Sequence, residues 1–244
     1  MVKLIIAQPL SSNRLEYDAI VPLKETERQR YFVDAKVFVE QKPLVGASST
    51  TDPFQAFGQS VRFGVRTLQD QGQAFWGAST GYDSLWLQGV YFQQAGAAFE
   101  YNTQSFQFVL TAGVPFSSSR DQMSGHAPLA SVNAQLSFPT GAPGLSVQPR
   151  IYVVGGQSTG SAVGGQLQFT YAWDRTWSAT LASSYDALTG ASGSLTFQVL
   201  LPQRSGAVAS TTIDPDLVNS FAGAVGNNGS RVIRLDNVPA ASGN

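Results

Sequence analysis

The sequence predicts an all-β protein: an antiparallel, up-and-down transmembrane β-barrel of about 12 strands, followed by a C-terminal tail. Three observations support this fold class. Apolar and polar residues alternate with a period of two in segments that are separated by turn residues, a pattern typical of antiparallel strands. Charged residues make up only 13% of the chain. Most predicted strands have roughly 9–11 residues, the length that a tilted strand needs to cross a membrane.

The clearest alternation lies in the central stretch, from Gln59 to Phe116. Its last segment, Phe106–Phe116, places Phe, Leu, Ala and Val on one face and mainly Ser, Gln, Thr and Gly on the other. Turns are predicted at 70–72 and at 83–84, where Asp, Gly and Ser interrupt the pattern. The stretch is therefore divided into five or six strands.

Further strands are predicted on both sides of this stretch, and together they define a barrel domain at residues 15–202. The glycine pairs at 155–156 and 164–165 are interpreted as turns. The strands outside the centre are expected at 15–23, 31–40, 129–138, 145–153, 167–173, 177–185 and 195–201.

The two ends of the chain differ from the barrel. Residues 1–14 contain the short apolar run Leu4–Ala7, which is interpreted either as a signal-peptide remnant or as a short strand. Residues 203–244 are rich in Ala, Ser, Gly and Asn. We expect this tail either to thread and plug the lumen or to stay loosely tethered.

The low fraction of charged residues indicates that the apolar face of the strands meets lipid and the polar face lines the lumen. A solvent-exposed sheet of this size would carry many Lys and Glu residues to block edge pairing. A barrel of about 12 strands is also too wide for side chains to fill, so its lumen is expected to be polar. The charged residues predicted to face the lumen are Asp34, Lys36, Glu40, Arg62, Arg66, Glu100 and Arg150. Their arginines either form a strip that selects anions or pair with carboxylates and rigidify the wall.

Aromatic residues gather toward the ends of the predicted strands. Tyr and Trp are enriched where a barrel meets the two membrane–water interfaces. The candidates for these interfacial positions are Tyr82, Trp86, Tyr101, Trp173, Trp177 and Tyr185.

Little in the sequence indicates catalysis. Residues 77–81 match the G-x-S-x-G motif around Ser79, with Asp121 and His126 downstream. That motif requires a strand–turn–helix context, whereas Ser79 lies within an alternating strand. The chain has no cysteine and one histidine, so neither a metal nor a cofactor is expected, and a net charge of −1 gives no case for nucleic acid. We expect a protein that is not an enzyme. The alternatives are a soluble β-rich binding or structural protein and an outer-membrane lipid hydrolase.

Several short segments resemble the barrel of inverse autotransporters, the intimin and invasin type. They are Gly58–Arg66, Trp76–Asp83, Gly96–Tyr101, Leu110–Phe116, Leu15–Leu23 and Trp177–Leu201. The resemblance implies a barrel in the outer membrane of a Gram-negative-type bacterium, inserted by the barrel-assembly machinery. It also implies a function as a membrane anchor and as a translocation conduit or passive pore for the protein's own C-terminal segment. An extracellular ligand of the loops would be a further partner.

Overall fold

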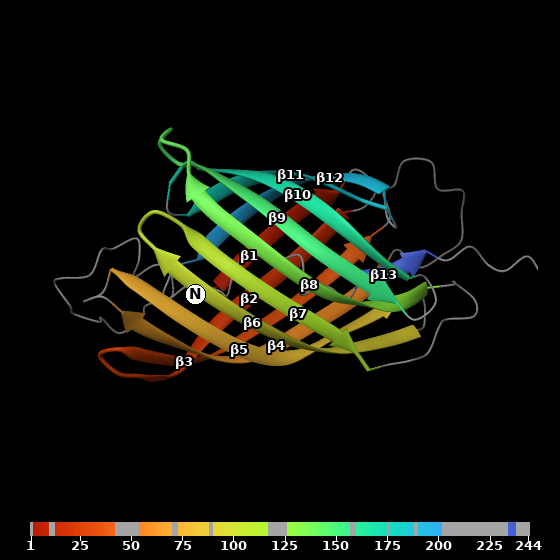
Figure 1. Ribbon diagram of the computed structural model, residues 1–244, viewed down its shortest axis with the longest axis horizontal. Coiled ribbons are helices and arrows are strands. Elements are labelled where there is room, and N and C mark those ends of the chain that lie inside the picture. The colour runs from red at the N-terminus through yellow and green to blue at the C-terminus, as the bar shows by residue number, and fades with distance from the viewer. Residues whose placement is uncertain are drawn as a thin grey trace, which may run out of the picture.

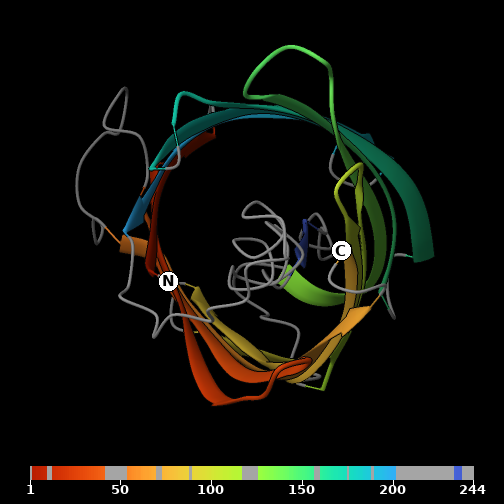
Figure 2. The same ribbon diagram turned by 90° about the vertical axis from the view of Figure 1, so that its left-hand side faces the viewer.

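The computed structural model describes residues 2–9, 13–41, 54–69, 73–87, 90–116, 126–156, 160–174, 176–187, 190–201 and 234–237. Twelve strands form a closed ring, seen end-on in Figure 2. Each pairs antiparallel with the next along the chain, and β1 pairs with β12 to close the ring. Among the described residues, no helix is long and apolar enough to cross a membrane.

The strands of the ring lean across one another around the barrel axis (Figure 1). They are β1 (Val2–Pro9), β2 (Asn13–Glu25), β3 (Gln29–Gln41), β4 (Phe54–Gln69), β5 (Ala74–Leu87), β6 (Val90–Thr103), β7 (Gln107–Pro115), β8 (His126–Pro139), β9 (Leu145–Gly156), β10 (Gly160–Ala172), β11 (Trp177–Asp186) and β12 (Gly190–Leu201). The predicted all-β, up-and-down barrel of about 12 strands is confirmed.

The two ends of the barrel differ in the lengths of their connections. At one end, here the turn end, the connections are 26–28, 70–73, 104–106, 140–144 and 173–176. The start of β1 and the end of β12 also lie at the turn end, since Val2 pairs with Leu201. At the other end, here the loop end, the connections include the two longest, 42–53 and 116–125. Short periplasmic turns and longer extracellular loops are typical of outer-membrane barrels.

A thirteenth strand, β13 (Arg234–Asn237), pairs antiparallel with the first residues of β8, His126–Leu129. These residues of β8 extend beyond its pairing with β7, which stops at Ser131. In Figure 2 the start of β8 turns away from the wall and β13 lies inside the ring. In Figure 1 both are at the loop end.

Three predicted boundaries were wrong. Val2–Pro9 is strand β1 of the wall, so the barrel begins before residue 15, in agreement with the short-strand interpretation of the N-terminus. No turn occurs at 83–84, because β5 continues to Leu87 and Asp83 pairs with Ser60 on one side and Gln94 on the other. The glycine pairs 155–156 and 164–165 lie within β9 and β10. Residues 214–217, whose Asp-Pro pair is typical of the start of a short helix, fall outside the described residues.

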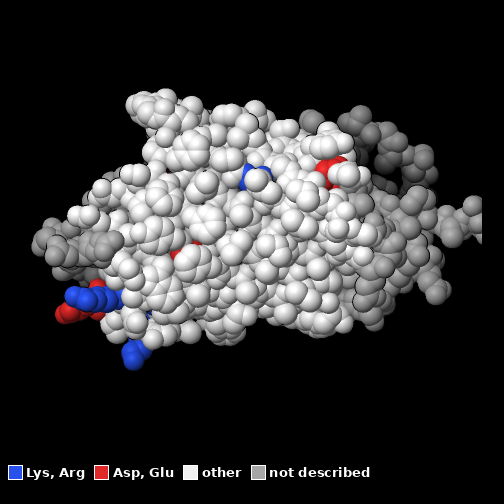
Figure 3. Space-filling model, in the orientation of Figure 1, with Lys and Arg blue, Asp and Glu red and all other residues white. Residues whose placement is uncertain are grey.

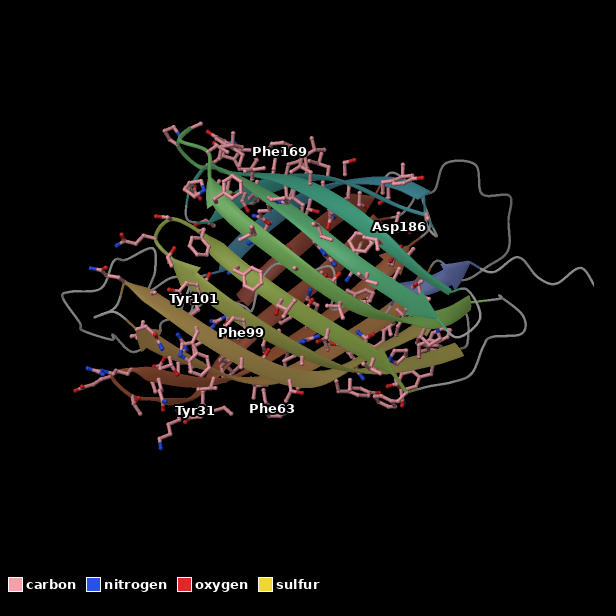
Figure 4. The ribbon with its side chains drawn as sticks, viewed as in Figure 1. Tyr31, Phe63, Phe99, Tyr101, Phe169 and Asp186 are labelled. Atoms are coloured by element: carbon pink, nitrogen blue, oxygen red, sulfur yellow. The ribbon has the colours of Figure 1, made fainter. Side chains whose placement is uncertain are left out.

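The outer surface of the barrel is apolar. Large hydrophobic side chains that would be buried in a soluble protein are exposed in every strand from β2 to β12, for example Phe63 (57%), Val163 (68%) and Leu181 (58%). Tyr31, Phe63 and Phe169 project outward from the wall in Figure 4. The inward-facing residues that alternate with them are mostly polar or charged. This arrangement contradicts the soluble alternative, in which the apolar face would be packed inside.

Exposed charge is confined to one end of the barrel. Among the described residues, the exposed charged side chains are Lys24, Glu25, Glu27, Arg28 and Asp174, all at or beside connections of the turn end. Figure 3 shows a largely uncharged surface between the two ends on the face in view. A bilayer's hydrocarbon requires such an uncharged band, about 25 Å tall in barrels of this kind.

Candidate functional site: the inner wall of the barrel

The inner wall is formed by the strand face opposite the exposed apolar residues, and its charged side chains are concentrated on β2–β6. Arg62 on β4 donates to Asp83 on β5 over 3.0 Å, and Gln94 on β6 donates to the same carboxylate oxygen over 3.0 Å. Asp34 on β3 is fully buried and lies in register with Arg62. Four adjacent strands therefore carry one continuous polar cluster.

A second cluster lies closer to the turn end. Arg66 is fully buried and binds Glu100 through two nitrogens, with Nε–Oε1 and Nη2–Oε2 distances of 2.5 and 3.2 Å. This bidentate geometry is the strongest form of an arginine–carboxylate pair. The guanidinium carbon also lies 4.8 Å from the ring centroid of Phe32 and 5.5 Å from that of Phe75. Cation–π contact of this kind stabilises a desolvated arginine.

A third group of charges joins β2 and β3. Lys36 Nζ lies 2.6 Å from Glu16 Oε1, and Arg14 Nη2 lies 2.9 Å from Glu16 Oε2, so one carboxylate binds two cations. Arg14 in turn lies over the ring of Phe38, 3.7 Å from its centroid. Glu40 is half-buried and pairs in register with Arg14.

The opposite part of the wall, β7–β11, uses amides and hydroxyls. Arg150 donates to Asn133 over 2.7 Å and to Gln166 over 3.1 Å, and Asn133 donates to Thr111 over 3.1 Å. A parallel row of hydrogen bonds joins the side chains of Gln135, Gln148, Thr170 and Thr180. Both rows run around the circumference of the barrel.

Glycines on the inner face allow long side chains to lie against the wall. A Cβ atom built at Gly81 would overlap the carbonyl oxygen of Val61 and lie 2.6 Å from Arg62 Cγ, and one at Gly96 would lie 2.7 Å from Arg62 Nη2. The remaining inward glycines with such a neighbour are Gly58 (beneath Phe38), Gly64 (Phe32), Gly77 (Glu100), Gly113 (Gln94) and Gly164 (Tyr152). Each long side chain thus covers a neighbouring strand instead of standing into the lumen.

The predicted lumen-facing charges are therefore brought together in part. Arg62 and Arg66 form ion pairs, and Glu100 is the partner of Arg66. Lys36 and Asp34 are buried nearby, whereas Arg150 lies on the amide side. Ion pairing at Arg62 and Arg66 supports the wall-rigidifying interpretation over an anion-selecting strip.

Among the described residues, four buried carboxylates of this wall were not in the predicted set: Glu16, Asp18, Asp83 and Asp186. Asp83 was assigned to a turn because Asp-Ser is a common turn sequence. Asp186 is the last residue of β11, and the carboxylate of Asp186 accepts a 2.7 Å hydrogen bond from the hydroxyl of Tyr152. The spacing along the strand could have identified Asp83. It lies an even number of residues from Phe75 and Ser79, which also face inward. A continuous period-two count through 75–87 would have retained it in the strand.

The candidate aromatic residues lie toward both ends of the barrel. Trp173 and Trp177 flank a turn-end connection and are exposed, whereas Trp86 and Tyr185 lie near the loop end and are also exposed. Tyr101 is half-buried and near the turn end, 6.0 Å from Phe106 between ring centroids. Tyr82, half-buried toward the loop end, shares a 2.8 Å hydrogen bond with the hydroxyl of Tyr91.

The structure gives Ser79 no catalytic setting. It is a buried residue in the middle of β5, with strand on both sides, so the strand–turn–helix context of the motif is absent. Asp121 and the side chain of His126 lie outside what the structure describes. Among the described residues, no group of three or more potential His, Asp or Glu metal ligands occurs.

Comparison with known proteins gives the fold. No family model and no curated protein matches the chain. One similar solved structure comes from work on the in-meso crystallization of membrane proteins, with a TM-score of 0.73 and 12% identity over 96% of this chain and 98% of that one. KdgM porin matches with a TM-score of 0.55 and 8% identity, covering 82% of this chain and 99% of the porin. Outer membrane phospholipase from Salmonella typhi matches with a TM-score of 0.55 and 8% identity, covering 82% of this chain and 90% of the phospholipase.

These neighbours include both porins and a phospholipase, so their fold alone assigns neither a pore nor an enzyme. What they share is the closed barrel that the register of β1–β12 forms here. The chain has the fold of an outer-membrane β-barrel, in agreement with the outer-membrane location that its sequence predicts.

Proposed function

We propose that this protein is an outer-membrane barrel of inverse-autotransporter type, which serves as a membrane anchor and as a conduit for its own C-terminal segment. One observation carries the proposal. Strand β12 ends at the turn end, whereas β13 lies at the loop end and inside the ring (Figures 1 and 2). The chain between them therefore has to connect the two ends of the barrel.

Residues 202–233 make this connection. An extended chain of that length reaches on the order of 100 Å, and the hydrocarbon core of a bilayer is about 30 Å thick. A path over the outer wall would place polar backbone in hydrocarbon, where each unsatisfied group costs several kcal/mol. A path through the lumen passes polar side chains on every side. The segment itself falls outside the described residues, so the lumen path is part of the proposal.

The chemistry of the inner wall supports passage of a sparsely charged, extended chain such as residues 203–244, whose three Arg and three Asp residues give no net charge. The charged side chains of β2–β6 largely neutralise one another within the wall, and those of Arg62, Arg66, Asp83 and Glu100 are at most 2% exposed. Strands β7–β11 offer amides and hydroxyls. The charged residues of that side, Arg150 and Asp186, are buried and hydrogen-bonded to Asn133 and Tyr152. Neither side therefore exposes a strong fixed charge that would trap a passing segment.

The outer wall supports insertion in the outer membrane, with the bilayer as the principal partner. Its apolar surface lies between the aromatic residues of the two ends, and its exposed charges are at the turn end. We place the turn end in the periplasm, as short turns usually are. The barrel-assembly machinery would then insert the barrel, and the loops would face any extracellular ligand.

The test is deletion of residues 203–244, with single-channel conductance measured in a planar bilayer. The intact protein should conduct little and the shortened barrel should show a stable, open conductance, because the segment no longer occupies the lumen. Heat-modifiable migration on a gel serves as the control that both proteins are folded barrels. Equal conductance of the two folded proteins would contradict the conduit proposal.

The absence of cysteine in the sequence permits a second, independent readout. A Ser242→Cys variant carries a single thiol beyond β13. If the tail leaves through the loop end, a membrane-impermeant maleimide should label this thiol on intact cells. Labelling only after the outer membrane is permeabilised would place the tail in the periplasm and would contradict the proposed direction.

A further inference from the structure

We infer that the first residues of β8, His126–Leu129, are a docking strand for an extended polypeptide that leaves the lumen at the loop end, and that Leu129 anchors this strand. The partner is Arg234–Asn237 of the same chain. This inference rests on the proposed conduit function and deepens it, because it assigns the place where the emerging segment is held.

The docking strand has backbone groups that the wall does not use. Pairing of β7 with β8 stops at Gly113 and Ser131, and pairing of β9 with β8 stops at Gly155 and Ala130. Residues 126–129 therefore extend past both neighbours, and they turn into the ring (Figure 2). The edge is occupied by β13, with Arg234 opposite Leu129 and Asn237 opposite His126. An exposed strand edge of this kind recognises any extended backbone through main-chain hydrogen bonds.

Leu129 fixes the docking strand to the inner wall. Its side chain is 1% exposed and packs in one buried apolar cluster with Tyr152, Val154 and Ala162. Tyr152 and Val154 alternate with the exposed Ile151 and Val153, so the cluster lies on the inner face of β9 and β10. The wall has a second buried apolar cluster, Ile20, Phe32 and Ala98. The cluster around Leu129 is the one that contains a residue of the docking strand.

The patch is itself held in place. The hydroxyl of Tyr152 donates to Asp186 on β11 over 2.7 Å, and its ring lies over Gly164 on β10. The tyrosine therefore spans three strands and presents a fixed surface to Leu129. Pro128, opposite Leu235, has no backbone N–H and therefore cannot donate to β13. The apolar cluster around Leu129 therefore holds the docking strand against the wall, and β13 pairs with the strand that is held there.

The experiment compares two identical substitutions in the same strand of the full-length protein. Leu129→Ala removes the anchor, whereas Leu136→Ala removes an outward side chain that is 43% exposed. In planar bilayers we expect Leu129→Ala to raise the open probability about tenfold or more, with brief openings toward the conductance of the tail-deleted barrel. Leu136→Ala should behave like the unmodified protein.

A second variant keeps the wall intact and weakens only the partner. Leu235→Pro removes a backbone donor from β13 and should cause the same openings. This variant decides the question if Leu129→Ala fails the heat-modifiability control for folding. Open probability unchanged in Leu235→Pro, and in folded Leu129→Ala, would overturn the docking strand.

The two proposals fail in different ways. If deletion of 203–244 opens the pore but both point variants stay closed, the conduit stands and the docking strand does not. If the deletion leaves conductance unchanged, the conduit itself is wrong.

Discussion

At the scale of single residues, the inner wall contains charged side chains that are almost completely buried. Arg66 and Glu100 are 0% and 2% exposed and bind each other through two hydrogen bonds. Removing one member of a buried pair leaves an uncompensated charge, which is far more costly than removing both. The contribution of this pair to folding is therefore visible only when single and double substitutions are compared.

We predict that Glu100→Ala lowers the free energy of unfolding by about 3 kcal/mol, the lower end of the range for breaking a buried pair. The Arg66→Met and Glu100→Leu double variant should recover much of the loss, since neither charge remains. Urea unfolding of the barrel in detergent, followed by tryptophan fluorescence, measures both effects. Arg28→Ala, which removes an exposed charge at the turn end, is the control and should change stability by less than about 0.5 kcal/mol. A double variant as unstable as the single one would show that the pair is not the source of the effect.

At the scale of strands, glycine and long side chains are matched across neighbours. The inward glycines of β4, β5, β6, β7 and β10 each lie beneath an aromatic, arginine, glutamine or glutamate side chain. This arrangement keeps the lumen clear while giving the wall side-chain contacts that glycine by itself lacks. In β10, the same packing accounts for Gly164, which lies within the strand beneath the ring of Tyr152.

Adjacent glycines in β10 give a matched test of this arrangement. A Cβ at Gly164 would overlap the ring of Tyr152, whereas a Cβ at outward-facing Gly165 would lie 3.9 Å from its nearest neighbour, the carbonyl oxygen of Arg150. We predict that Gly164→Ala destabilises the barrel by about 1–3 kcal/mol through overpacking. Gly165→Ala should be neutral or stabilise by up to about 1 kcal/mol. Urea unfolding in detergent measures both; equal effects would contradict the packing role of Gly164.

The sequence predicted the strand faces better than the strand ends. Alternation placed the charged residues of 31–40 on the face opposite Tyr31 and Val37. It also placed the polar residues of 106–116 on the face opposite Leu110 and Val114, because side-chain parity is a local property of the backbone. The count of about 12 came from two offsetting errors: an extra strand created by the false turn at Asp83, and a missing strand at Val2–Pro9. In the sequence, Asp83 resembles a turn residue. Its place in the strand depends on hydrogen bonds from Arg62 and Gln94, which are distant along the chain and cannot be read from the local sequence. For the same reason the apolar cluster around Leu129 was not predicted.

At the scale of the whole molecule, the exposed apolar surface and the distribution of charge have one physical explanation. Phe, Leu, Val and Ile side chains cover the middle of the outer wall, and exposed charges occur only at the turn end among the described residues. Lipid hydrocarbon accommodates apolar side chains, whereas a charged side chain in hydrocarbon is energetically costly. The cost of a charge on this surface should therefore depend on its height along the barrel.

Two outward-facing positions with similar exposure test this dependence. Phe63 is 57% exposed in the middle of β4, and Leu23 is 62% exposed beside the turn end. An arginine near the bilayer midplane of such barrels costs about 2–4 kcal/mol, and near the interface about 0–1 kcal/mol. We therefore predict that Phe63→Arg lowers the unfolding free energy in liposomes by at least about 2 kcal/mol more than Leu23→Arg does. In detergent micelles, which let water reach the charge more easily, the difference should shrink. Equal costs in liposomes would mean that this wall does not face hydrocarbon.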